Sequence, residues 1–313
     1  MIRLLITGAA GNLGSLLATH LLPCKDIRLR LMIHHRDIPE HLKAGGKCAV
    51  VRADLSQPET LTAAVEDIDV IVHFAGILFK AHPEKFLPTT NTQYFKNLVD
   101  TANRKGVRRI ILISFPHVEG PTTPQHPSTD RLDRQPLSWH AKTRLEEEKY
   151  LFANAREPIS LRVGMVYGDG ILMPDMARKL ASLHLLGVWR ERTQIHLISK
   201  DDFCAAVQAT VSNGEANGIY NIGDDGNDSL QEYLSLACRQ WGTARPWRMP
   251  LWMIYTAAWF CELYSSLTGN QALLTKDFID IGRVGYYGDT SRMKRDLLPK
   301  LKYPTTRDGL ETF

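Results

Sequence analysis

The sequence predicts an α/β protein with a doubly wound parallel sheet and a smaller, mainly helical lobe toward the C-terminus. Three observations predict this class. Short apolar runs typical of strands alternate with helix-period segments over the first half of the chain. Three evenly spaced glycines follow the first run, and beyond residue 168 short helical and strand patterns are mixed. A chain of 313 residues is long enough to bury both parts.

The first unit begins with an apolar run at residues 2–6, which indicates a strand buried on both faces. Leucines recur at helical spacing from residue 13 to 22, directly after Gly8, Gly11 and Gly14. Glycines allow a sharp turn that brings the backbone close to a pyrophosphate, whose charge then lies at the positive end of the new helix. Strand, glycine turn and helix together predict a Rossmann-type nucleotide-binding site.

The remaining elements follow in chain order. Further strands are expected at Ile27–Ile33, Cys48–Arg52, 69–74, Arg109–Ser114, 159–163, 194–198 and Gly218–Ile222. Helices are expected at 61–65, 91–105, Trp139–Asn154, 201–211, Leu230–Gln240 and 251–267, with a loop at 116–136 and a turn at 164–170. These elements predict a nucleotide-binding domain of residues 1–168, with returning segments near 194–226. A substrate-binding lobe then takes residues 169–193 and 227–313.

The composition narrows the functional class. The formal net charge of +4 is small for this length and spread along the chain, which gives little reason to expect nucleic acid as a partner. Lys105, Arg108 and Arg109 are expected at the solvated end of a helix. The five cysteines lie far apart, with no zinc-like spacing, so we expect a reduced, cytoplasmic setting and no metal site. No signal peptide precedes the first strand, and the most apolar window, residues 250–261, is too short for a transmembrane segment.

The glycine spacing Gly-x-x-Gly-x-x-Gly, preceded by Thr7, resembles the extended branch of the short-chain dehydrogenase/reductase superfamily, the epimerase/dehydratase-like proteins. Segments at 54–55, 73–76, 91–99, 161–168 and 219–223 match the same family in order, so the resemblance covers nearly the whole chain. It implies a nucleotide site along the carboxyl ends of the strands. The cofactor-binding residues expected from the glycine turn and the resemblance are Gly8, Ala10, Gly11, Asn12, Leu13, Gly14, His34, Arg36, Asp54, Leu55, Phe74, Ala75, Gly76, Asn91, Lys142 and Val163.

The resemblance also implies a catalytic Tyr, a Lys four residues later that holds the nicotinamide ribose, and a Ser or Thr that polarises the substrate oxygen. Here Lys142 is followed by Glu146 four residues later, as in the family. Ser138 stands four residues before Lys142, where the Tyr would be, and Phe115, next to Ser114, stands where the Ser or Thr would be. We therefore expect that the ordinary Tyr–Lys mechanism does not operate.

Two interpretations stay open. In the first, another group transfers the proton, and His117 is the best candidate because histidine titrates near neutrality and relatives place acid/base carboxylates at this strand end. Ser114 and Ser138 are further candidates near the chemistry, and Lys142 would hold the nicotinamide ribose. Histidines without a catalytic task remain the alternative for both His117 and His140. In the second interpretation, the protein binds a nucleotide without turning over a substrate.

The end of the second strand bears on the cofactor. The sequence there is His34-His35-Arg36, with no carboxylate before Asp37. NAD-specific relatives usually end this strand with an acidic residue, whereas a 2′-phosphate requires cations. NADP(H) is therefore favoured, with Arg36 as the expected phosphate ligand, while Asp37 keeps NAD(H) possible.

The second lobe bears on the substrate. Residues 250–261 are rich in large apolar side chains, which indicates a core helix, a wall of an apolar pocket, or a surface that meets a partner or a membrane. Residues 262–275 resemble steroid dehydrogenase-like and dihydroflavonol reductase-like members, which favours a small hydrophobic substrate. Arg245, Arg248 and Arg283 could equally meet a diphosphate.

We expect an NADP(H)-dependent oxidoreductase of the atypical extended short-chain dehydrogenase/reductase type, acting on a carbonyl, alcohol or enone. The alternatives are a nucleotide-sugar epimerase/dehydratase-like enzyme and a non-catalytic NAD(P)-binding regulatory or structural protein. A homodimer is possible.

Overall fold

The structure is a computed structural model that describes residues 1–43, 46, 48–76, 80–268, 272 and 274–313. In this part of the chain seven strands form one sheet in the order β10-β6-β5-β4-β1-β2-β3, and every neighbouring pair is parallel. The strands are β1 (Ile2–Thr7), β2 (Ile27–Ile33), β3 (Cys48–Arg52), β4 (Val70–His73), β5 (Arg109–Ser114), β6 (Glu157–Val163) and β10 (Gly218–Ile222). This order reverses beside β1, so the predicted doubly wound fold is confirmed.

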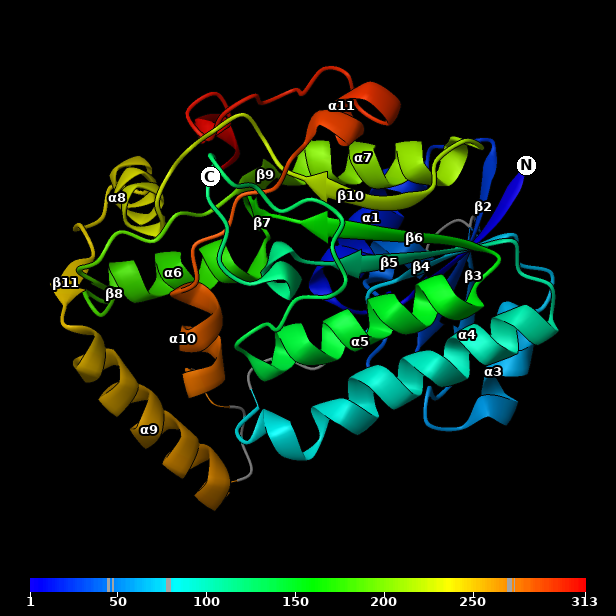
Figure 1. The fold of residues 1–313 in the computed structure, drawn as a ribbon, viewed down its shortest axis with the longest axis horizontal. Helices are drawn as coiled ribbons and strands as arrows, with labels where there is room; N and C mark the ends of the chain where they lie inside the picture. The colour runs from blue at the N-terminus through cyan, green and yellow to red at the C-terminus, as the bar shows by residue number, and fades with distance from the viewer. Residues whose placement is uncertain (44–45, 47, 77–79, 269–271, 273) are drawn as a thin grey trace.

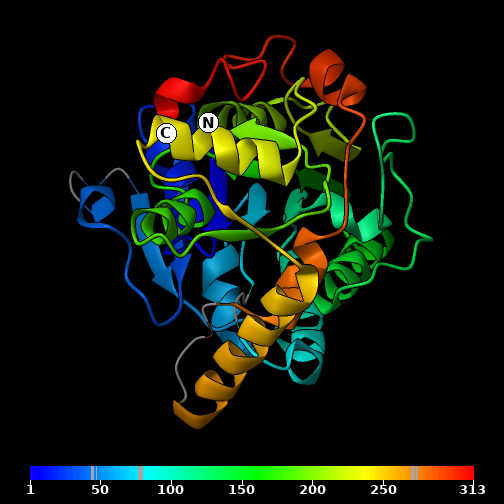
Figure 2. The same cartoon turned by 90° about the vertical axis from the view of Figure 1, so that its left-hand side faces the viewer.

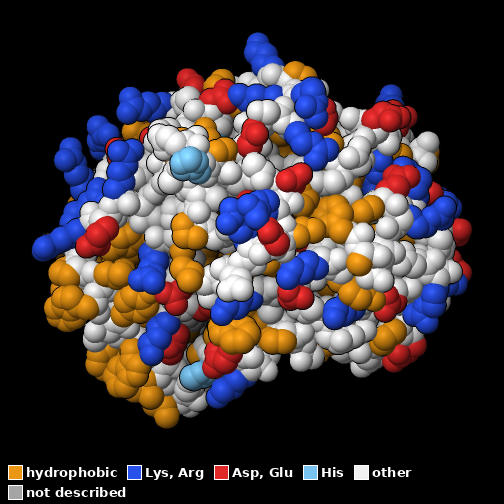
Figure 3. Space-filling model, in the orientation of Figure 1, with side chains coloured by type: hydrophobic (Ala, Val, Ile, Leu, Met, Phe, Trp, Pro, Cys, Tyr) orange, Lys and Arg blue, Asp and Glu red, His pale blue; other side chains and the backbone are white. Residues whose placement is uncertain are grey.

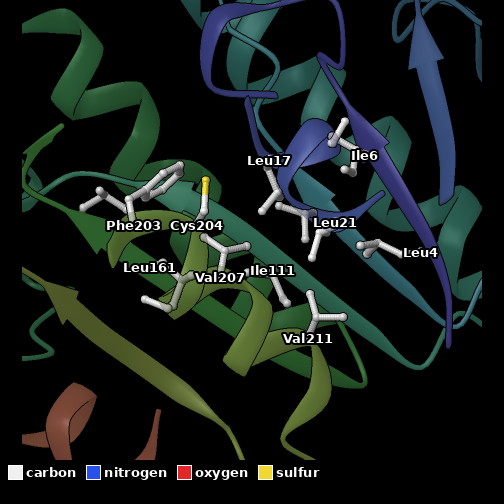
Figure 4. Packing of buried hydrophobic residues seen from close by; sticks show 14 of the residues in the cluster. Leu4, Ile6, Leu17, Leu21, Ile111, Leu161, Phe203, Cys204, Val207 and Val211 are labelled. Atoms are coloured by element: carbon white, nitrogen blue, oxygen red, sulfur yellow. The ribbon is translucent and has the colours of Figure 1, made fainter. Parts of the chain in front are cut away.

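Helices cover both faces of the sheet (Figure 1). One face carries α1 (Asn12–Leu21) and α7 (Lys200–Ser212), and the other carries α3 (Pro58–Val65), α4 (Tyr94–Arg104) and α5 (Trp139–Asn154). The short α2 (Glu40–Lys43) precedes β3. Leu17 and Leu21 of α1 pack with Val207 and Val211 of α7 (Figure 4). Side chains alternate across the sheet, so both faces of the central strands are buried.

The second lobe has a core of its own, built largely from residues beyond 168. Its helices are α6 (Leu172–Ser182), α8 (Leu230–Gln240), α9 (Leu251–Thr268) and α10 (Lys276–Gly282). Two small sheets pair β8 (Gly187–Trp189) with β11 (Trp247–Met249) and β7 (Met165–Tyr167) with β9 (Leu197–Ser199). The last helix, α11 (Ser291–Asp296), contacts β10 of the large sheet. In Figure 2, α9 extends away from the rest of the molecule.

Most of the expected elements are confirmed, and four details are wrong. The helix expected at 91–105 is divided, because a π-helical turn at Pro88–Gln93 precedes α4. The turn at 164–170 contains β7, and the strand expected at 194–198 is displaced to β9. Arg109 does not end a helix in solvent: it begins β5, is 1% exposed and donates to the carbonyls of Thr210, Asn213 and Gly214.

Candidate functional site

The turn at the end of β1 leaves no room for a side chain at its three glycines. A Cβ on Gly14 would lie 2.4 Å from the Gly8 carbonyl oxygen, and one on Gly11 would lie 3.0 Å from the same atom. Gly8 has φ +68°, and a Cβ on it would lie 3.0 Å from the nitrogen of Ala75. Helix α1 has no side-chain cap and no acidic residue in its first turn. The turn therefore fits a pyrophosphate held by backbone N–H groups and the positive end of the helix.

The other residues of the turn divide between core and lobe contacts. Ala10 and Leu13 pack against the sheet core. The Asn12 side chain donates to the Gly170 carbonyl at 2.6 Å and accepts from the Leu172 N–H at 3.0 Å. Asn12 thereby ties the glycine turn to the start of α6.

Further expected nucleotide residues follow the neighbouring strands. Phe74, Ala75 and Gly76 come directly after β4, and the Phe74 N–H donates to the carbonyl of Thr7 at 3.3 Å. Val163 ends β6 and is buried. Because the carboxyl ends of parallel strands meet at one edge of the sheet, these residues and the glycine turn lie at the same edge.

At the far end of that edge, basic side chains cluster at the ends of β2 and β3. The His34 Nε2 atom lies 3.3 Å from the Asp54 carboxylate, which with Leu55 follows β3. Arg52, the last residue of β3, pairs with Asp37 at 2.9 Å and donates to the His34 carbonyl. Arg36 is exposed beside them. Sequence reasoning missed Arg52, although the parallel register places it opposite Ile33, just before the expected phosphate ligand.

Several buried polar atoms near the same edge have no hydrogen-bond partner in the described structure. They are Ser114 Oγ at the end of β5, Asn91 Oδ1 in the π-helical turn, and Glu147 Oε1 on α5. Buried polar groups nearly always have partners, so such a group indicates a place where a ligand or water completes the bonding.

His117 lies in a tightly packed environment. Its ring stands 4.3 Å from that of Tyr286 and 5.4 Å from that of Phe115, centre to centre. Burial lowers the pKa of His117 to about 4, so the imidazole is neutral at pH 7. The near-neutral titration on which its expected role depends is therefore not what this environment provides.

Helix α5 presents two stripes of residues with the same four-residue spacing. Ser138 caps the helix through a hydrogen bond from the Ala141 N–H, 3.2 Å long. Lys142 is exposed, with its ammonium 4.9 Å from the centre of the Trp139 ring, and Glu146 is exposed as well. Since one helical residue turns the side chain by about 100°, a stripe that begins two residues later faces the opposite side.

That opposite stripe is buried and consists of His140, Arg144 and Glu148. Glu148 accepts from Arg162 Nη2 of β6 at 2.7 Å and from Ser160 Oγ at 2.8 Å. A Cβ on Gly76 would lie 3.3 Å from Arg144 Nη2, so the guanidinium lies beside the end of β4.

His140 and Arg144 of the buried stripe each have a charged partner. His140 Nδ1 is paired with the carboxylate of Asp277 on α10, which also accepts from the Trp139 N–H at 2.8 Å. Arg144 pairs with Glu147 at 2.5 Å. Burial raises the pKa of Glu147 to about 7, although the charge of Arg144 opposes that rise. Burial first, and then the charge of Arg144, lower the pKa of His73 to about 3.

A family model described as NAD(P)H-binding matches residues 8–164, which run from the glycine turn to the end of β6. The chain belongs to the NAD(P)H-binding family. No group of three or more His, Cys, Asp or Glu side chains in the described part of this NAD(P)H-binding chain is arranged to hold a metal ion. Nor does any helix among the described residues have the length and apolarity needed to cross a membrane.

Curated relatives cover part of the chain. Uronate dehydrogenase of Pseudomonas syringae pv. tomato is 32% identical over 172 residues, which make up 53% of this chain and 60% of that protein. The 3 beta-hydroxysteroid dehydrogenase type 7 of Mus musculus is 28% identical over 188 residues, 53% of this chain and 50% of that protein. The chain thus spans between half and three-fifths of the length of these relatives.

The fold matches over the whole chain. The crystal structure of UDP-glucuronic acid 4-epimerase from Bacillus cereus, in complex with UDP-glucuronic acid and NAD, superposes with a TM-score of 0.77 at 18% identity. The superposition covers 99% of this chain and 97% of that one. Together with the family model and the relatives, this places the NAD(P)H-binding chain in the extended branch of the short-chain dehydrogenase/reductases.

In that branch a Tyr is followed by a Lys four residues later and by a Glu four residues after the Lys. Two stripes of α5 have this four-residue spacing: Ser138, Lys142 and Glu146, and His140, Arg144 and Glu148. The stripe of Ser138 and Lys142, whose lysine is exposed, is the one that the sequence analysis singled out. Only the buried stripe ends in a carboxylate bound to the sheet, which is Glu148. Sequence reasoning considered His140 without giving it a role and missed Arg144 and Asp277. The repeated spacing was the one available signal for Arg144.

Proposed function

We propose that this chain is an NAD(P)-linked oxidoreductase for a small organic substrate, in which His140 and Arg144 occupy the positions of the family's Tyr and Lys. The observation that carries the proposal is the buried stripe of α5, with Arg144 beside Gly76 and Glu148 bound to β6. Within this stripe Arg144 lies beside Gly76, which follows β4, and His140 stands one helical turn before Arg144 on the same face of α5. Lys142 and Ser138 then belong to the outer face of the helix and its cap.

Each residue has a separate role in the proposed hydride and proton transfer. A bound nicotinamide cofactor supplies or accepts the hydride. His140 moves the proton: as an imidazolium it gives a proton to the substrate oxygen during reduction, and as a neutral ring it takes that proton back during oxidation. Asp277, a positioning residue, holds Nδ1 and fixes the plane of the ring. Arg144, which lies beside Gly76, would hold the ribose hydroxyl groups of the cofactor.

We also propose a preference for NADP(H). Arg36 and Arg52 place two guanidinium groups at the ends of β2 and β3, where a 2′-phosphate would bind. Asp37, the carboxylate that would favour NAD(H), is already paired with Arg52.

Four further expectations stay predictions. They are the hydrophobic carbonyl or alcohol substrate, the cytoplasmic setting, the domain limits and the homodimer.

The test measures cofactor binding and turnover separately. NADPH and NADH are titrated by nicotinamide fluorescence, and turnover is followed by absorbance with uronic acids, UDP-glucuronic acid, a 3β-hydroxysteroid, and simple ketones and enones. His140→Gln should lose at least about a hundredfold in kcat while NADPH binding is retained. The matched control, Ser138→Ala, should keep its turnover.

Arg144→Met should weaken cofactor binding, whereas Lys142→Met, the same change on the exposed stripe, should not. If Lys142→Met abolishes turnover and Arg144→Met does not, the stripes have been assigned the wrong way round. Tight NADPH binding without turnover of any substrate would favour the non-catalytic alternative. Exchange of sugar stereochemistry without net change in NADPH would favour the epimerase alternative.

A further inference from the structure

Helix α9 is apolar on the side that it turns to solvent. Taken at about 100° per residue, its exposed large apolar side chains fall within an arc about 140° wide, opposite the buried Ile254, Ala258 and Ser265. We call this arc the α9 face. Its main members are Trp252, Trp259, Phe260, Leu263, Tyr264 and Leu267.

The size of this face is unusual for a helix at a protein surface. Trp252 is 67% exposed, Phe260 is 60% exposed and Leu267 is 78% exposed. Trp247 of β11 and Leu185, which precedes β8, continue the apolar surface beyond the start of the helix. Figure 3 shows this surface as an apolar area at the lower left. Contiguous apolar patches of this kind mark binding surfaces.

Arginines lie near the start of the α9 face. Arg245 and Arg248 are exposed in the segment that leads into the helix, and Arg239 is exposed near the end of α8. Figure 3 shows Lys and Arg side chains gathered above the apolar area. The single carboxylate on α9, Glu262, lies outside the arc and accepts from the Lys276 N–H at 2.8 Å.

We propose that the α9 face and its arginines bind the surface of a membrane that contains anionic lipids. Large apolar side chains enter the boundary between headgroups and acyl chains, Trp and Tyr lie at that boundary, and arginines meet lipid phosphates. A second copy of the chain is the other occupant that an apolar face could take, and the oligomeric state measured below distinguishes it from a membrane. In this proposal α9 lies along the membrane surface.

With the α9 face on the membrane, the candidate active site would lie close to the apolar interior of the bilayer. Helix α9 packs on α10, which carries Asp277, the partner of His140. An apolar substrate dissolved in the bilayer would therefore reach the lobe from the membrane side. The binding proposal itself does not depend on the catalytic one, since membrane binding is measured without turnover.

The test is flotation of the full chain with vesicles of phosphatidylcholine alone and of phosphatidylcholine with a third of phosphatidylglycerol. The wild type should float with the anionic vesicles, and high salt should weaken this binding. The double variant Trp259→Ser/Phe260→Ser should reduce binding roughly tenfold or more. Arg245→Gln/Arg248→Gln should reduce binding to anionic vesicles only.

The matched control is Val50→Ser, an exposed apolar residue on the edge strand β3, which should bind vesicles like the wild type. Unchanged circular dichroism and NADPH binding would show that each variant is folded. The proposal is wrong if the wild type floats with neither vesicle or if the double variant floats equally well. A dimer in size-exclusion chromatography that Trp259→Ser/Phe260→Ser dissociates, without vesicle binding, would assign the face to a second copy.

Discussion

Asp224 should make the stability of the protein fall as the pH rises. It follows β10, is 1% exposed, and its Oδ1 accepts from the Gly226 N–H at 2.9 Å. Its Oδ2 has no partner among the described residues. Burial, helped by the negative charge of nearby aspartates, raises the pKa of Asp224 to about 8. The folded state therefore binds this proton more tightly than the unfolded state.

The sign and size follow from that difference. The carboxyl is protonated in both states at very low pH, so the contribution of Asp224 to stability is greatest there and is lost as the pH rises from the unfolded pKa toward the folded one. A difference of about four pKa units, at about 1.4 kcal/mol each, costs roughly 5–6 kcal/mol above the folded pKa. Between about pH 5 and about pH 9 the loss is on the order of 4 kcal/mol.

Asp224→Asn removes this titration and keeps the shape of the side chain. We expect the variant to be more stable than the wild type, by a margin that grows by roughly 4 kcal/mol between about pH 5 and about pH 9. Urea unfolding at both pH values measures the margin. The control Asp225→Asn removes the same charge from an exposed neighbour paired with Lys294 and should show no such growth. Parallel pH profiles for wild type and Asp224→Asn would refute the reasoning.

Three further predictions concern the nucleotide site and its support. Arg52→Gln should weaken NADPH binding roughly tenfold and leave NADH binding unchanged, as measured by fluorescence titration. Gly14→Ala places a Cβ 2.4 Å from a carbonyl oxygen and should raise the Kd for both cofactors, whereas Gly214→Ala, with open space around it, should not. Glu148→Gln should cost about 3 kcal/mol in urea unfolding, because it removes one of two carboxylates from the fully buried Arg162; an unchanged midpoint would contradict the assignment.

The sheet and the nucleotide-binding turn could be predicted because their signals are local. Strands buried on both faces appear as continuous apolar runs, and β5 begins and ends at the expected residues. The glycine turn follows from three positions within seven residues. Helix α5 begins at the expected residue, Trp139, after a loop that ends at Pro136, and the structure adds that Ser138 caps it.

The residues proposed to act on the substrate and to hold the cofactor's phosphate and ribose could not be predicted from local signals. His140 and its partner Asp277 are separated by 137 positions, and no spacing rule joins them. Arg52 joins the basic group only through the register of two neighbouring strands. The choice between Lys142 and Arg144 depends on which face of α5 meets the sheet, and a repeated spacing of four cannot decide that.

The two replacements that we propose on the buried stripe, His140 for Tyr and Arg144 for Lys, are chemically compatible. A tyrosine has a reference pKa of about 10 and needs a nearby cation before it can act as a base near neutral pH. Histidine as a residue type has a reference pKa near neutrality, so in the proposed reaction the cation at the fourth position is needed only to hold the ribose. Arginine suits that reduced role, because its guanidinium keeps its charge and binds paired oxygen atoms. A chain with histidine at the first position can therefore carry arginine at the second. The prediction that follows is that His140→Tyr, which leaves Arg144 in place, should lose most of the wild-type turnover, whereas His140→Tyr/Arg144→Lys should regain part of it.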